Sequence, residues 1–133
     1  MSRDNVEIVR RSFERFNRRD LAGAVAPFER DAEWVPYLAA LEEEIYRGRE
    51  DIERMWREVL RDVPDFHIEF VDVVAESPDT VVVEVEFRGT GKSSGADIRT
   101  TVYQAASFRE GKVTRVQGFR TAAEALETVW PPE

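Results

Sequence analysis

Residues 66–87 read FHIEFVDVVAESPDTVVVEVEF, and this segment indicates the type of fold. Apolar and polar residues alternate in both halves of it, which is the pattern of half-buried β-strands. In the first half the apolar positions change phase between Phe70 and Val73, which predicts a β-bulge. Ser77-Pro78-Asp79 is a turn sequence between the halves. The second half places one set of residues toward a core, namely Val81, Val83, Val85 and Phe87, and another set outward, namely Glu84, Glu86 and Arg88.

The chain after this segment continues as strands and ends in a helix. Gly89–Gly95 is expected to be a flexible connection, and Ile98–Phe108 the next strand. Glu110-Gly111 forms a tight hairpin turn into a strand over Val113–Phe119. Thr121 and Glu124 are spaced as a capping box for a terminal helix, whose apolar positions are Ala122, Ala125, Leu126 and Val129.

The chain before it is mostly helical. Apolar residues at helical spacing predict a helix over residues 5–18, with Asp4 and Glu7 as a weak capping box. Asp20 is placed to cap a short helix that runs through Phe28, and residues 32–36 form a brief strand. A third helix fits Glu50–Asp62 and is stopped by Pro64. Helices followed by antiparallel strands indicate an α+β fold, in which the helices pack on a strongly curved, mainly antiparallel sheet.

Composition limits the classes of function. The 133 residues suit one domain spanning residues 1–133. A net charge of −8, with 19 basic residues interleaved among 27 acidic ones, disfavours nucleic-acid binding. The apolar runs are too short to span a membrane, and the N-terminus lacks the pattern of a secretory signal, so we expect a cytoplasmic protein. With no cysteine and one histidine, we expect neither a metal nor another cofactor.

Two features resemble functional motifs. Gly89-Thr90-Gly91-Lys92-Ser93 ends like a phosphate-binding loop, but Glu86 stands where the earlier glycine is required, and the segment joins two strands. That motif therefore fails. His67 shares the polar phase of its strand with Glu69, which favours a surface histidine over a general base.

Large aromatic residues point to a pocket. Trp34, Tyr37, Tyr46 and Trp56 lie around a long connection from Pro36 to Arg47, which is typical of the wall and lid of a binding site. Packing in the core explains each ring separately. Glu42-Glu43-Glu44 in this connection would either place an acid at the pocket mouth or be solvated.

Gln104 is the most informative single residue. Counting back from the hairpin turn, Phe108 pairs with Val113 and shares one face with Ala106, Gln104 and Val102. An amide therefore lies in an apolar row, where it must find a hydrogen-bond partner. That partner is either a neighbouring strand or helix, or a bound ligand.

Several segments together resemble the SnoaL-like proteins of the nuclear transport factor two-like superfamily. They are Arg15–Leu21, Asp31–Trp34, Tyr46–Ile52, Phe108–Val113 and Glu124–Glu127. The resemblance implies a cone-shaped fold around an apolar pocket, and frequently a homodimer. Relatives include ketosteroid isomerases, polyketide cyclases, epoxide hydrolases and dehydratases, so the resemblance is specific for fold rather than activity.

The chain departs from the catalytic residues that such relatives imply. In an isomerase-like alignment, Ser12 replaces a tyrosine, Pro36 replaces the general-base aspartate, and Gln104 replaces the neutral, oxyanion-binding aspartate. The cyclase-like carboxylate is missing as well, at Gln117-Gly118-Phe119. Steroid-type isomerisation is therefore not expected.

Three functional hypotheses follow. The first is a pocket protein for an apolar, ring-containing metabolite, which acts as a cofactor-free isomerase, cyclase or hydratase. Gln104 orients a carbonyl or hydroxyl of the metabolite, Ser12 gives a second polar contact, and the walls are Phe16, Trp34, Tyr37, Trp56, Val102 and Phe119. The second is a binding module of the same shape without catalysis. The third is an interaction domain, in which the face with Glu84, Glu86 and Arg88 pairs two copies or recruits another protein.

Overall fold

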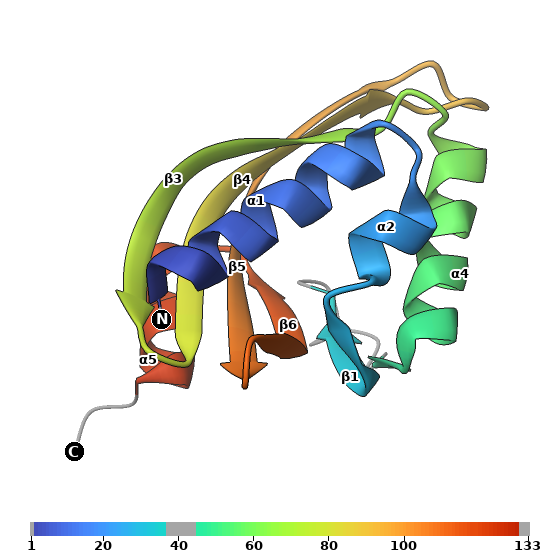
Figure 1. The fold of residues 1–133 in the computed structure, drawn as a ribbon. Helices are drawn as coiled ribbons and strands as arrows, with labels where there is room; N and C mark the ends of the chain where they lie inside the picture. Colours follow the sequence, from blue (N-terminus) through green and yellow to red (C-terminus); the bar gives the residue numbers. More distant parts are fainter. Residues whose placement is uncertain (1, 37–44, 131–133) are drawn as a thin grey trace.

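A curved sheet wraps around a long helix in the computed structural model, which describes residues 2–36 and 45–130 (Figure 1). The helices are α1 (Ser2–Asn17), α2 (Leu21–Val25), α4 (Arg49–Asp62) and α5 (Ala122–Val129). The strands are β1 (Phe28–Val35), β2 (Tyr46–Arg47), β3 (His67–Ser77), β4 (Thr80–Thr90), β5 (Asp97–Arg109) and β6 (Lys112–Phe119). Their order in the sheet is β2-β1-β6-β5-β4-β3. The α+β prediction is confirmed.

The first two helices differ from prediction at their ends. α1 begins at Ser2, so Asp4 lies inside its first turn and cannot be the cap that was predicted with Glu7. α2 begins as expected, because Oδ1 of Asp20 accepts a hydrogen bond of 3.0 Å from the amide of Gly23. It ends at Val25 rather than Phe28. Pro27 is followed directly by β1, in which Phe28 pairs with Val113.

β1 is the strand that departs most from the predicted sheet. It begins at Phe28, four residues before the predicted strand, and pairs in parallel with β6 while the other strand pairs are antiparallel. The predicted long connection from Pro36 to Arg47 ends in β2, in which Tyr46 pairs with Trp34. β1 and the edge strand β2 lie at the end of the sheet near α4 (Figure 1), and the ring of Trp34 in β1 is 5.6 Å from that of Trp56 in α4.

The curvature of the sheet has a local cause in β3. The predicted phase change is confirmed as two register shifts against β4, between Phe70 and Asp72 and between Val73 and Ala75. Bulges of this kind bend a strand and increase its twist. The bent β3 and β4 thereby curve over α1 (Figure 1).

The β5–β6 hairpin sets the orientation of β5. Glu110 and Gly111 both have positive φ, at 51° and 77°, which is the conformation of a type I′ turn. Phe108 pairs with Val113, as predicted. Gln104, Ala106 and Phe108 are all buried on the concave side, so the predicted apolar row of β5 is confirmed.

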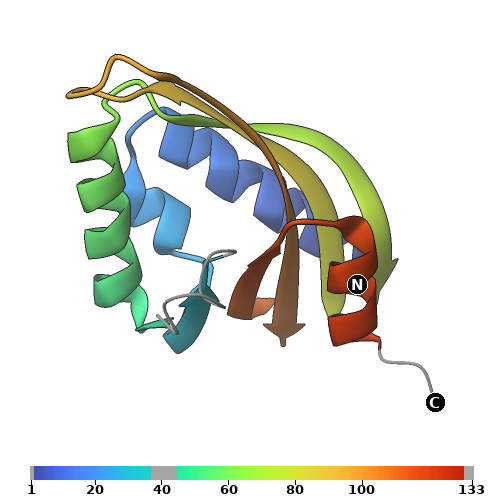
Figure 2. The same ribbon diagram turned by 180° about the vertical axis from the view of Figure 1, so that it is seen from behind.

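Two apolar clusters lie on opposite sides of the sheet. The main core fills the space between the concave face and α1, α2 and α4. A small cluster of Val82, Ala105, Phe119 and Ala125 joins the sheet to α5, and α5 lies on the outer side of the sheet (Figure 2). In the described part of the chain, no helix has both the length and the apolar character needed to cross a bilayer.

Candidate functional site

An apolar cavity lies between the concave face of the sheet and the helices. Its volume is about 240 Å³. The described lining residues are Phe16, Trp34, Val35, Pro36, Met55, Trp56, Val59, Phe66, Ile68, Phe87, Val102, Gln104 and Gly118. A smaller cavity of about 30 Å³ lies deeper, toward α1, and shares Phe16, Trp34, Trp56, Ile68 and Gln104 with the first.

Trp56 of α4 is the centre of the aromatic wall. Its ring lies 5.6 Å from that of Phe16, 6.0 Å from that of Phe28 and 5.6 Å from that of Trp34, and all three pairs are nearly perpendicular. Edge-to-face contacts of this kind stabilise the rings beyond the burial of their surface. The wall is therefore held in place before any ligand binds.

Gln104 brings a polar group into this apolar space. It is 4% exposed and lines both cavities. No hydrogen bond joins its side-chain amide to any of residues 2–36 or 45–130. Its partner in β6 is Gly118, which has no side chain to crowd the amide. The amide thus faces the cavity with its hydrogen-bonding capacity unused by the described residues.

Ser12 has a structural bond. Its hydroxyl donates a hydrogen bond of 2.8 Å to the carbonyl of Ala24, which ties α1 to α2. It also lines the smaller cavity, and its oxygen keeps lone pairs that can accept a bond there. Ser12 is therefore a weaker candidate for ligand binding than Gln104.

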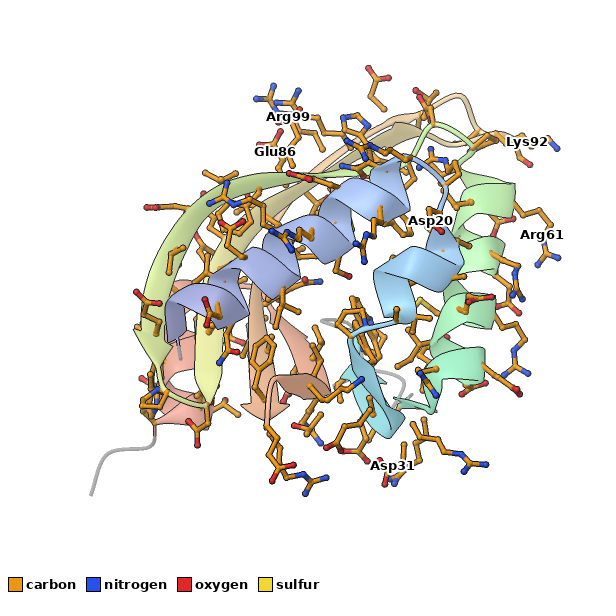
Figure 3. All side chains as sticks on the ribbon, in the orientation of Figure 1. Asp20, Asp31, Arg61, Glu86, Lys92 and Arg99 are labelled. Atoms are coloured by element: carbon orange, nitrogen blue, oxygen red, sulfur yellow. The ribbon has the colours of Figure 1, made fainter. Side chains whose placement is uncertain are left out.

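The ionisable side chains of the described residues lie outside both cavities. The described lining residues of both cavities include no Asp, Glu, His, Lys, Arg or Tyr. Charged side chains such as Asp31, Arg61 and Lys92 point away from the body of the protein (Figure 3). His67 is on the surface, as predicted, with Nε2 3.7 Å from a carboxylate oxygen of Glu69. No cluster of metal-ligating side chains occurs within the described ranges.

The resolved shifts in carboxyl pKa also occur outside the cavities. The backbone amide of Thr90 donates a hydrogen bond of 2.7 Å to Asp65 and holds the pKa of that carboxyl below its ordinary value. A hydrogen bond from Arg88 likewise lowers the pKa of Glu86 on the outer face of the sheet. Neither carboxylate lines a cavity, so these shifts belong to the scaffold.

Most of the predicted site residues meet at one place. Phe16, Trp34, Trp56, Val102 and Gln104 all line the larger cavity. Tyr37 and Glu42-Glu43-Glu44 lie outside the described residues.

Phe119 is the exception, because it packs in the outer cluster with Val82. The reason is a register shift in the β5–β6 hairpin: Phe108 pairs with Val113, but Ser107 pairs with Arg115, so Thr114 is an extra residue. One extra residue exchanges the two faces of a strand.

Because of the same register shift, the sequence did not predict that Gly118 lies opposite Gln104. Regular pairing from Phe108 and Val113 would place Gln117 opposite Gln104, whereas the bulge places Gly118 there. Glycine within a strand is a signal of close approach by a ligand or another backbone. Phe66, Ile68 and Phe87 were also omitted from the predicted walls, although their alternation had assigned them to the buried phase.

Comparison with known proteins agrees with this architecture. Residues 9–116 match the family model of the SnoaL-like domain. An NTF2-like protein of unknown function from Burkholderia pseudomallei K96243 is 22% identical, with 98% of this chain and 99% of that one covered and a TM-score of 0.77. None of the curated proteins matches the sequence.

Two further solved structures share the fold. TerC, co-crystallised with polyporic acid, is 21% identical, with 93% of this chain and 96% of that one covered and a TM-score of 0.76. SalBIII, an epoxide hydrolase/cyclase-like enzyme with a role in pyran ring formation in the polyether salinomycin, is 17% identical, with 91% and 93% covered and a TM-score of 0.75. At these identities the likeness shows the fold alone.

Proposed function

The chain belongs to the SnoaL-like domain family, and on that premise we propose that its 133 residues form one domain that binds an apolar, ring-containing small molecule in the cavity between sheet and helices. The ligand contacts the wall of Trp34 and Trp56 and hydrogen-bonds to Gln104. TerC and SalBIII support the proposal, because the first was co-crystallised with polyporic acid and the second has a role in pyran ring formation.

The observation that carries this proposal is the unbonded amide of Gln104. Buried polar groups in proteins nearly always have a hydrogen-bond partner. Here the side chain is 4% exposed, lines a cavity and has no bond to a described residue. A ligand that bonds to this amide supplies the missing partner.

The size of the cavity supports a ring as ligand. An engineered apolar cavity of about 150 Å³ binds benzene. The cavity here is larger, at about 240 Å³, and its wall is aromatic. It therefore has room for a compound larger than benzene, with flat surfaces against the tryptophans.

Binding without acid–base catalysis is the function that we favour. Isomerisation, cyclisation and hydration without a cofactor need a group that transfers a proton close to the reacting atoms. The described cavity lining offers an amide, a hydroxyl and indole rings, none of which titrates near neutral pH. An enzyme would have to obtain its proton-transfer group from residues other than these.

Native mass spectrometry of the purified protein after incubation with a metabolite extract tests the proposal. We expect one small molecule to be retained unaltered, and to be lost in Gln104→Met. Gln117→Met is the matched control, because Gln117 is the other glutamine of the chain and bonds to Arg115 outside both cavities. A steady conversion of one metabolite mass into another would contradict binding without catalysis. Absence of any adduct would contradict the proposed cavity ligand.

The homodimer that the family resemblance implies is also proposed. Support comes from the outer sheet face, where Glu86 bonds to both Arg88 and Arg99 and forms a surface of mixed charge. Such a surface offers both signs of charge to a second copy. Sedimentation equilibrium tests this, and a single species near 15.4 kDa would contradict it.

Location in the cytoplasm is proposed on the composition of the chain. A sequence without cysteine forms no disulfide bonds and therefore does not need an oxidising compartment for its stability. Fractionation of cells that produce the protein from its own gene checks this, and recovery from the secreted fraction would contradict it.

A further inference from the structure

Resting on the proposed function, we infer that the ligand is an uncharged ring compound that carries a hydrogen-bond donor and an acceptor side by side. A carboxamide, a lactam and a ring hydroxyl next to a carbonyl all have this arrangement. The Gln104 amide binds both groups at once.

The chemistry of the amide calls for both a donor and an acceptor on the ligand. A glutamine side chain offers one carbonyl that accepts and one NH₂ that donates, and both are free of bonds to the described residues. A ligand with an acceptor alone satisfies the NH₂ and leaves the buried carbonyl unpaired. Sites that bury a polar group discriminate strongly against ligands that leave it unpaired.

The position of the amide leaves both of its ends open to the cavity. Gln104 is on β5 between β4 and β6, where its neighbours across the ladder are Val83 and Gly118. Neither neighbour has a polar side chain that competes for the amide. Gly118 has no side chain at all and leaves space beside Gln104 for a ligand edge. Both ends of the amide can therefore be reached from the cavity.

The apolar lining disfavours a charged ligand. The described lining has no side chain that neutralises an ion, and an ion loses its hydration on entering apolar surroundings. The net charge of −8 adds a repulsion for anions. The site therefore selects uncharged compounds.

Four naphthalenes of nearly equal size test this inference by isothermal titration calorimetry on the full chain. 2-Naphthamide has the donor and acceptor together, 2-acetonaphthone has the acceptor alone, 2-ethylnaphthalene has neither, and 2-naphthoate is the charged analogue of the amide. We expect 2-naphthamide to bind about tenfold more tightly than 2-acetonaphthone. We expect 2-ethylnaphthalene to be weaker still and 2-naphthoate to be the weakest.

Variants assign the preference to one residue. In Gln104→Met the amide and the ketone should bind equally, whereas Gln117→Met should keep the wild-type order. Nuclear magnetic resonance gives an independent readout, because Asn5, Asn17, Gln104 and Gln117 are the only side-chain amides in the sequence. The NH₂ signals that vanish in Gln104→Met identify Gln104, and 2-naphthamide should shift them in the wild type.

The outcomes separate this inference from the proposed function. Equal binding of the three uncharged compounds would overturn the inference and leave the cavity as a site for apolar rings. Tightest binding of 2-naphthoate would overturn the selection for uncharged ligands. Failure of all four compounds to bind would overturn the proposed function as well.

Discussion

Replacement of Gln104 by methionine is expected to make the ligand-free protein more stable. Methionine has a chain of similar length and no polar atom that needs a hydrogen bond, so it suits the apolar row of Val102, Ala106 and Phe108. In the wild type, folding moves the amide from bulk water into an apolar cavity without giving it a bond to a described residue. A residue that serves a ligand commonly costs stability in this way.

The size of the effect follows from burial. A buried polar group without a partner costs about 1–3 kcal/mol in protein mutational data, and Gln104 is 4% exposed. Unfolding entropy of about 2.1 cal/mol/K per residue gives about 0.28 kcal/mol/K for this chain. The melting temperature should therefore rise by about 4–11 °C.

Calorimetric melting of wild type, Gln104→Met and Gln117→Met measures the change. Gln117 is only partly buried and bonds to Arg115, so its replacement should change the melting temperature little. A lower melting temperature for Gln104→Met would refute the reasoning, because it would mean that the amide stabilises the fold through a bond of its own.

Three further predictions concern the wall, the strand glycine and a surface carboxylate. Trp56→Ala should lower the free energy of unfolding in urea by about 3–5 kcal/mol, because it removes a ring packed against three others, and Trp56→Phe should lower it less. Gly118→Val should weaken the binding of 2-naphthamide at least tenfold by filling space beside Gln104, with an unchanged circular dichroism spectrum; unchanged affinity would contradict the position of the site. The lowered pKa of Asp65 means that its contribution to stability is present above its unfolded value of 3.8 and is lost as the pH falls through the folded pKa. Asp65→Asn should therefore lose less stability than the wild type between pH 5 and pH 2, roughly the acid range in which such carboxylates titrate, and identical acid unfolding curves would contradict this.

The hairpin turn and the alternation of apolar residues were enough to predict the part of the site that lies on β5. The Glu110-Gly111 turn determines which residues pair beside it, and alternation from Phe108 then places Gln104 on the concave side. Helical spacing likewise placed Phe16 and Trp56 on buried faces of α1 and α4. These signals extend over a few residues each, so they can be recognised without knowledge of the rest of the chain.

The start of β1 and the faces of β6 were predicted wrongly, because both depend on pairing with another strand. Phe28 joins β1 because of its partner Val113, and no local signal near Pro27 shows that a strand begins there. The extra residue Thr114 has no special backbone angle and no glycine, yet it decides that Gly118 rather than Phe119 faces the cavity. Alternation gives the two faces of a strand, and a single bulge exchanges them.

The parallel pairing of β1 with β6 has a consequence for synthesis. Val113 follows its partner Phe28 by 85 residues, so β1 remains without this neighbour until nearly the whole chain has left the ribosome. At roughly 5–20 residues per second, that interval lasts several seconds or longer, during which the apolar side of β1 lacks its cover. β6 also supplies Val113, Val116 and Gly118 to the two cavities. We therefore expect nascent chains arrested before Lys112 to bind a chaperone and to retain no 2-naphthamide, whereas retention of 2-naphthamide by such chains would show that the cavity forms earlier.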